Sequence, residues 1–175
     1  MRNTIVWLLS LVVFGVSSLS IYAMEKKGKK ETPPPSNEFI MALKKGIDFS
    51  DPALPAIVKS VTGISGAEAN GRWTDGGKVT ITFTQKLPKS FKLHIESKGA
   101  FGPNVNKPIQ VIIGKWKGSI IINNEKIKPF DLVVKTVTPV DTIEFIVPEP
   151  KSPEELKISN DPRKLGFWMT KLSIE

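Results

Sequence analysis

From about residue 57 onward, apolar residues alternate with polar ones, which is the pattern of strands with one buried face. The clearest run is 79–83, in which Val79, Ile81 and Phe83 alternate with threonines. Further short runs rich in β-branched or aromatic residues lie at 91–95, 109–113, 120–122, 132–134, 143–147 and 166–174. Clusters of Gly, Pro, Asn and Asp separate them. We therefore predict an all-β fold over residues 57–175, an antiparallel β-sandwich or jelly roll of about seven to eight strands.

The alternation also assigns faces to individual side chains. In the last run, Trp168, Leu172 and Ile174 are separated by four and then two residues and are expected on one face. His94, the only histidine, lies between Leu93 and Ile95 and is expected on the solvent face. We interpret His94 as an ordinary exposed strand residue rather than the base of a Ser-His-Asp triad.

An apolar segment precedes the predicted sheet. Residues 5–16 are apolar except for Ser10, Arg2 precedes them, and small and polar residues lead to Ala23. This layout is typical of a secretory signal covering residues 1–23. Alternatively, residues 5–24 are long enough for a single uncleaved anchor in the inner membrane. Lysines directly after the run would favour a cytoplasmic location for the chain beyond an uncleaved helix, so cleavage fits an exported domain better. Either way, we expect a periplasmic or cell-envelope location.

Two short segments connect this region to the predicted strands. Residues 24–37 combine lysines with three consecutive prolines and are expected to form an extended spacer. Residues 38–56 are expected to contain a short helix and the segment leading into the sheet. Asn37 would cap that helix, Phe39, Ile40 and Leu43 would share one face, and Gly46 would end it.

Composition removes several classes of chemistry. The chain has no cysteine, which excludes disulfides, a thiol nucleophile, a zinc–thiolate site and a lipidated N-terminal cysteine. A single histidine excludes a multi-histidine metal site, and neither a calcium-binding Asp-x-Asp-x-Asp-Gly loop nor a Walker-type loop occurs. We expect no metal, no cofactor and no catalysis.

The net charge of +8 falls to +7 without residues 1–23, since 24 basic residues then face 17 acidic ones. We interpret this excess as a solvated lysine-rich surface. An arginine-rich stripe with interleaved aromatics is missing, so nucleic acid is not an expected partner.

One segment gathers the side chains that carbohydrate recognition requires. Glu68, Arg72, Trp73 and Asp75 lie within eight residues, directly before the clearest strand. A flat aromatic face packs on sugar C–H groups, and planar polar groups bind paired hydroxyls. The alternative is structural: Trp73 enters the core, while Arg72 forms an internal ion pair with Asp75 or Asp161.

Two further clusters carry candidate binding residues. Asp161 begins a turn from which Arg163 and Lys164 project, and this turn would bind an anion or lock onto the first cluster. Asn104 follows Gly102 and Pro103 at a strand-to-turn junction, where it would satisfy backbone groups or face a ligand.

The clusters occur in a recognisable order. They are residues 63–68 (Gly-Ile-Ser-Gly-Ala-Glu) with 71–76 (Gly-Arg-Trp-Thr-Asp-Gly), Leu87-Pro88, 100–104 (Ala-Phe-Gly-Pro-Asn), and 150–153 (Pro-Lys-Ser-Pro) with 161–166 (Asp-Pro-Arg-Lys-Leu-Gly). This series resembles the β-rich accessory domain attached to bacterial membrane phosphoglycerol transferases of periplasmic glucan synthesis and to some membrane glycosyltransferases. The resemblance covers residues 57–175 and implies a sandwich with an accessory role near envelope glycans. Catalysis in those enzymes belongs to a separate metal-dependent domain. One departure is Asn70, where we would expect an aromatic residue.

Two functions remain as hypotheses. The first is a non-catalytic envelope module that binds a glycan or glycolipid headgroup through the residues singled out above. The second is an assembly subunit of a membrane protein complex that uses protein surfaces alone, with Trp116 between Lys115 and Lys117 as a candidate contact.

Overall fold

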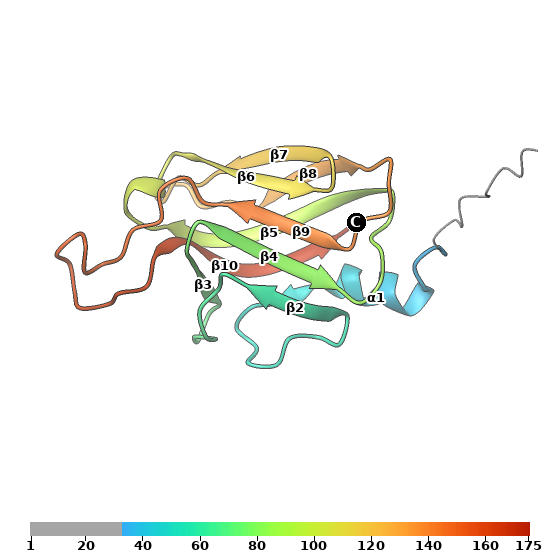
Figure 1. Ribbon diagram of the computed structural model, residues 1–175, viewed down its shortest axis with the longest axis horizontal. Helices are drawn as coiled ribbons and strands as arrows, with labels where there is room; N and C mark the ends of the chain where they lie inside the picture. The colour runs from blue at the N-terminus through green and yellow to red at the C-terminus, as the bar shows by residue number, and fades with distance from the viewer. Residues whose placement is uncertain (1–32) are drawn as a thin grey trace, which may run out of the picture. The chain divides into compact units, whose positions relative to one another are not determined.

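The computed structural model describes residues 33–175 (Figure 1). The predicted signal or anchor, residues 1–23, lies outside the described residues, as does most of the predicted spacer. Residues Thr32–Glu175 form one compact unit. Within the described part, no helix is long and apolar enough to cross a membrane.

Ten strands within residues 33–175 form two antiparallel sheets. Sheet A contains β1 (Ile47–Asp48), β3 (Arg72–Asp75), β5 (Ser90–Ala100), β8 (Phe130–Lys135) and β10 (Leu165–Ile174). Sheet B contains β2 (Val58–Thr62), β4 (Lys78–Phe83), β6 (Pro108–Ile113), β7 (Trp116–Ile121) and β9 (Thr142–Ile146). The predicted antiparallel sandwich is therefore confirmed. The strand number is higher than expected because β1 and β3 have only two and four residues, too few to show alternation.

The strand order shows how distant segments meet. Sheet A has the order β1-β10-β5-β8, with β3 also pairing with β10, and sheet B has the order β2-β4-β9-β6-β7. In Figure 1, sheet B runs from β2 at the bottom to β7 at the top, and β10 and β5 lie behind it. The last strand therefore contacts strands from the first half of the chain.

The core lies between the sheets. Val79, Ile81 and Phe83 are almost fully buried, as their alternation predicted. Across the layers, the rings of Phe145 in β9 and Phe167 in β10 have centroids 5.6 Å apart. These contacts hold the sandwich together by apolar packing, which suits a chain without cysteine.

The helix α1 (Asn37–Lys45) packs onto this core. Ser36 caps it, not the expected Asn37, because the Ser36 hydroxyl accepts a hydrogen bond from the Phe39 backbone N–H at 3.2 Å. Phe39 and Leu43 are buried, and the Phe39 ring meets the Phe83 ring edge-on at 6.3 Å. The helix and the sandwich consequently share one hydrophobic core.

The strand β10 departs from simple alternation. Phe167, Met169, Leu172 and Ile174 are buried, whereas Trp168 is half-buried on the other face. The pairing of β10 with β5 shifts register on both sides of Met169. An inserted residue inverts the side-chain parity, so the prediction that Trp168 shares a face with Leu172 and Ile174 is wrong.

Candidate functional site

A tight hairpin begins the site. The backbone N–H groups and carbonyls of Glu68 and Gly71 bond to each other at 2.9 and 3.2 Å, so Ala69 and Asn70 form the tip. Gly71 has φ 138°, and a Cβ there would lie 2.2 Å from the Met169 carbonyl oxygen. Only glycine permits this close approach, which brings the hairpin and β3 against β10.

An aromatic pair, Trp73 and Trp168, lies on the outer face of sheet A. The two residues are direct partners in the β3–β10 pairing, and their rings are perpendicular with centroids 4.9 Å apart. Phe101 meets Trp73 edge-on at 6.0 Å. The Trp168 Nε1–H donates to the Asn70 carbonyl at 2.9 Å. Both indoles are half-buried, so Trp73 packs firmly yet keeps part of its surface at the solvent.

Arg72 points along the surface to the segment before β2. Its Nε donates to the Phe49 carbonyl at 3.1 Å, and its Nη2 donates to the carbonyls of Asp51 and Pro52 at 2.8 and 3.2 Å. The alternative in which Arg72 pairs with Asp75 or Asp161 is therefore wrong. Three backbone carbonyls use its donors, and the guanidinium holds this segment in place.

The ion pair with Asp161 is made by Arg163 instead. Arg163 Nε and Nη2 donate to the Asp161 carboxylate at 3.0 and 2.7 Å, and Nη1 donates to Glu68 at 3.0 Å. These hydrogen bonds, to Asp161 first and then to Glu68, raise the pKa of Arg163. In turn, the hydrogen bonds from Arg163 lower the pKa of Asp161. The guanidinium thus joins the 161–166 turn to the hairpin, although the two segments are far apart in sequence.

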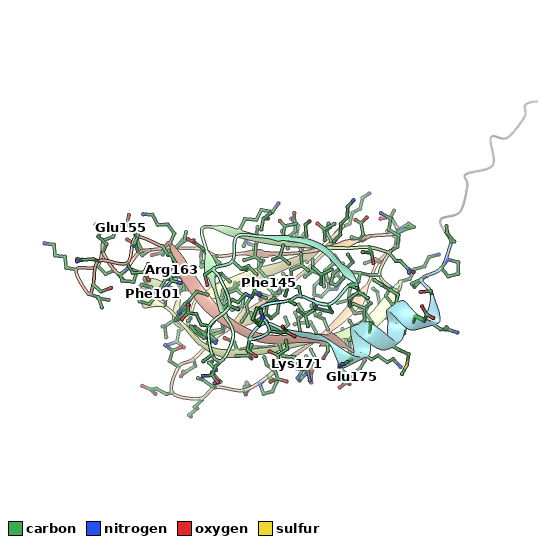
Figure 2. All side chains as sticks on the ribbon, turned by 90° about the horizontal axis from the view of Figure 1, so that it is seen from below. Phe101, Phe145, Glu155, Arg163, Lys171 and Glu175 are labelled. Atoms are coloured by element: carbon green, nitrogen blue, oxygen red, sulfur yellow. The ribbon has the colours of Figure 1, made fainter. Side chains whose placement is uncertain are left out.

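Asp75, at the end of β3, and Lys164 add a link between β3 and the 161–166 turn. The Asp75 carboxylate accepts a hydrogen bond from the Lys164 backbone N–H at 2.9 Å. The Lys164 ammonium pairs with Glu155, whose pKa is lowered mainly by that hydrogen bond and also by the Ser152 N–H. Figure 2 shows Glu155, Arg163 and Phe101 at the end of the domain opposite α1.

Asn104 occupies a different position from the other candidates. It is fully buried in the short 3₁₀ helix η1 (Gly102–Asn104). Its Nδ2 donates to the Glu149 carbonyl at 2.8 Å and to the Phe101 carbonyl at 3.1 Å, while its Oδ1 accepts from the Glu149 N–H at 3.0 Å. Asn104 therefore holds two loops together and presents no surface to a ligand.

A groove of about 360 Å³ lies on the outer face of sheet A, next to the hairpin tip whose Asn70 carbonyl accepts the Trp168 hydrogen bond; neither indole is among its lining residues. Its floor comes from β5 and β10, one wall from the hairpin tip with Asp48 and Ser50, and the other wall from the β7–β8 loop. The lining residues are Asp48, Ser50, Ala69, Asn70, Glu96, Ser97, Lys98, Ile127, Lys128, Pro129, Thr170 and Lys171. Figure 2 shows Lys171 on the side of β10 that faces away from sheet B.

The sequence did not indicate this groove. The sequence marked Asn70 only as a departure from the expected aromatic residue. Nothing in the linear pattern showed that Asp48, Glu96, Lys128 and Lys171 would line a groove with it.

His94 and Trp116, the two other residues considered from the sequence, do not line the groove, and each contacts residues of its own sheet. His94 lies on the outer face as expected, with Nδ1 2.7 Å from Asp131 and Nε2 3.4 Å from Glu96. Trp116 folds over Gly118, where an added Cβ would lie 2.4 Å from the indole, and it packs against the core. In residues 33–175, no group of three or more His, Cys, Asp or Glu side chains is arranged to hold a metal ion.

These observations describe an all-β sandwich that carries an aromatic pair and a charged groove on the outer face of one sheet. Three relatives share sequence with it, each called phosphoglycerol transferase I, from Escherichia coli, Citrobacter koseri and Shigella boydii. Each is 35% identical over 130 residues, which is 72% of this chain and 17% of the relative. The chain thus spans about a sixth of the length of these relatives.

Residues 37–175 match the family described as a domain of unknown function (DUF7024), and the chain belongs to that family. The resemblance to the accessory domain of phosphoglycerol transferases is confirmed.

Solved structures give a weaker likeness. A mutant of CBM29-2, from work on ligand recognition by family 29 carbohydrate-binding modules, is 12% identical with a TM-score of 0.45 and covers 73% of this chain and 87% of its own. A structure described as carbohydrate binding module family 29 is 14% identical with a TM-score of 0.40 and covers 73% and 84%. At these values the likeness gives no information on a ligand of this chain.

Proposed function

We propose that this domain is a non-catalytic accessory module of the bacterial envelope that binds a glycan through the outer face of sheet A. The observation that carries the proposal is the half-buried Trp73–Trp168 pair beside a polar groove. An indole with one accessible side supplies the flat apolar surface on which sugar C–H groups pack. The groove supplies carboxylate, amide, hydroxyl and ammonium groups at the same face.

The geometry suits a rigid binding site better than a reaction. The charged side chains of the turn are tied to one another, with Arg163 between Asp161 and Glu68. Such bonds fix the loops around the aromatic pair before a ligand arrives, which lowers the ordering cost of binding. We assign the glycan contact to Trp73, Trp168 and the groove. We assign a positioning role to Arg72, Arg163, Asp161, Asp75, Lys164 and Asn104.

The envelope setting rests on sequence. The relatives are named phosphoglycerol transferases, and the chain matches only a small part of each. We propose that this part keeps an enzyme or an assembly close to envelope glycans, whether residues 1–23 are cleaved or anchor the chain.

Binding of short β-glucan oligosaccharides to the full chain, measured by titration calorimetry, tests the proposal. Trp73→Leu is expected to reduce affinity roughly tenfold, because the aromatic face is lost while an apolar contact remains. Trp73→Phe keeps a smaller aromatic face and should bind between Trp73→Leu and wild type.

Trp116→Leu is the matched control, since Trp116 is also half-buried but lies on sheet B. Equal affinities for wild type and a folded Trp73→Leu would overturn the site assignment. Failure of the wild-type chain to bind any oligosaccharide in a broader envelope-glycan panel would overturn glycan binding itself.

A further inference from the structure

Three lysines lie around the groove, and one of them, Lys171, is the direct cross-strand neighbour of Asp48 in β1 and of Glu96 in β5. Lys98 comes from β5, Lys128 from the β7–β8 loop and Lys171 from β10, and all three line the groove. Within residues 33–175, none of them forms an ion pair. By contrast, Lys92 at the far end of β5 pairs with Glu175.

The two carboxylates of the groove flank Lys171 across the strands, and each also makes a close contact elsewhere. Asp48 accepts hydrogen bonds from the Ser50 hydroxyl at 2.7 Å and the Ser50 N–H at 2.8 Å. Those bonds, together with the nearby Lys171 charge, lower the pKa of Asp48. Glu96 lies 3.4 Å from His94 Nε2. The ammonium groups therefore outnumber the carboxylates, and neither carboxylate is tied to a lysine by an ion pair.

The loop that carries Lys128 is held in place. Asn124 Oδ1 accepts from the Ala100 N–H at 2.8 Å, and Asn124 Nδ2 donates to the Ala100 carbonyl at 2.9 Å. This paired contact joins the start of the loop, four residues before Lys128, to the end of β5. The cationic side of the groove is consequently built on two strands and a loop that is bonded to β5 at its start.

We propose that the groove selects a ligand in which an anionic group, such as a phosphate ester, is attached to a polyhydroxylated body. This inference rests on the proposed glycan-binding function and specifies its ligand. The three ammonium groups neutralise the anion, while Asn70, Thr170 and the carboxylates of Asp48 and Glu96 bind hydroxyls. A volume of about 360 Å³ accommodates a sugar unit with one substituent.

The experiment compares four probes on the full chain by titration calorimetry: a β-linked glucose hexasaccharide, the same hexasaccharide with a phosphate ester on one C6 hydroxyl, glycerol 1-phosphate and inorganic phosphate. The phosphorylated hexasaccharide is expected to bind roughly tenfold more tightly than the neutral one, which corresponds to about 1.4 kcal/mol. Added salt should reduce this preference.

Lys98→Ala, Lys128→Ala and Lys171→Ala are each expected to reduce the preference and to leave affinity for the neutral hexasaccharide nearly unchanged. Lys59→Ala is the matched control, since Lys59 is an exposed lysine on β2 of sheet B and its substitution removes the same charge. Circular dichroism of each variant confirms that the fold is kept.

The outcomes separate this inference from the proposed function. If the neutral hexasaccharide binds, Trp73→Leu weakens it, and the lysine variants change nothing, the anionic selectivity is wrong and glycan binding stands. If glycerol 1-phosphate binds through the lysines and neither hexasaccharide binds, the anion site stands and its ligand is a lipid-type headgroup. Glycan binding is then wrong. Binding of inorganic phosphate alone, or of no probe, overturns the inference.

Discussion

The hydroxyl of Thr74 provides a sharp test of how the site is supported. Thr74 is fully buried, next to Trp73 on β3. Its Oγ1 accepts a hydrogen bond from the Phe167 N–H at 3.0 Å, where the β3–β10 pairing shifts register between Leu165 and Trp168. Because the shift leaves that N–H without a strand partner, the threonine side chain replaces the missing ladder bond.

The packing around the Thr74 hydroxyl determines how much stability its removal costs. Thr74→Val keeps the shape but leaves the Phe167 N–H without an acceptor, which costs about 1–3 kcal/mol. Close packing prevents relief by water: a Cβ on Gly166 would lie 2.5 Å from Thr74 Oγ1 and 2.6 Å from a Val147 methyl carbon. Thr74→Ser keeps the hydroxyl and deletes one buried methyl, which costs about 1 kcal/mol. Valine should therefore destabilise the domain by about 2 kcal/mol, which is about 1 kcal/mol more than serine.

Urea unfolding of the three proteins, followed by tryptophan fluorescence, measures the difference. Trp73 and Trp168 flank the substituted position, so their emission reports the local structure. The urea concentration at the unfolding midpoint should decrease in the order wild type, Thr74→Ser, Thr74→Val. The slope of the unfolding free energy against urea concentration should stay the same in all three proteins. If Thr74→Val is as stable as wild type, or more stable than Thr74→Ser, the hydroxyl does not support the register shift and the reasoning is refuted.

Three further predictions concern the same region. Gly71→Ala should destabilise the domain by about 3 kcal/mol through strain and a backbone clash, whereas Gly66→Ala, which meets nothing within 4 Å, should be nearly neutral in the same unfolding assay. The pKa of Asp161 should lie below 3.8 by NMR titration and rise toward that value in Arg163→Gln. Since the pKa of Asp161 is lowered in the fold, the stabilisation that the Asp161–Arg163 pair gives should be present above pH 3.8 and be lost as the pH falls through the lowered pKa. If wild type and Arg163→Gln unfold identically in acid, this prediction is wrong. Asn104→Ala should lower stability by about 2–4 kcal/mol without a change in the glycan affinity of the folded fraction, because its amide bonds only to backbone groups; weaker glycan binding by the folded variant would contradict this.

Local patterns predicted the elements well. The alternation of residues 79–83 gave a half-buried strand, and the apolar spacing of Phe39 and Leu43 gave a helix with one buried face. Both rest on periodicity, which depends on neighbours in sequence. The cap was assigned one residue too late because Ser36 and Asn37 are both good caps, and the choice depends on backbone geometry.

Tertiary pairings were not predictable in the same way. Arg72 and Arg163 are both near acidic residues in sequence, and nothing local indicates that Arg163 takes Asp161 while Arg72 binds carbonyls. The face of Trp168 depends on inserted residues that alternation does not register. The groove depends on the strand order of sheet A, which places Lys98 and Lys171 on neighbouring strands.

The central place of β10 in sheet A has a consequence for how the domain forms. This strand pairs with β1, β3 and β5, and its contacts with the hairpin span more than ninety residues of sequence, as in the bond between Trp168 and Asn70. Contacts of such separation form late, because the chain between them must first be ordered. While the chain is being synthesised, sheet A is expected to stay open, with its apolar inner face exposed, until β10 joins it. The aromatic pair, with one indole on β3 and one on β10, then assembles in the same step that closes the sheet, so the proposed binding surface forms only when the fold is complete.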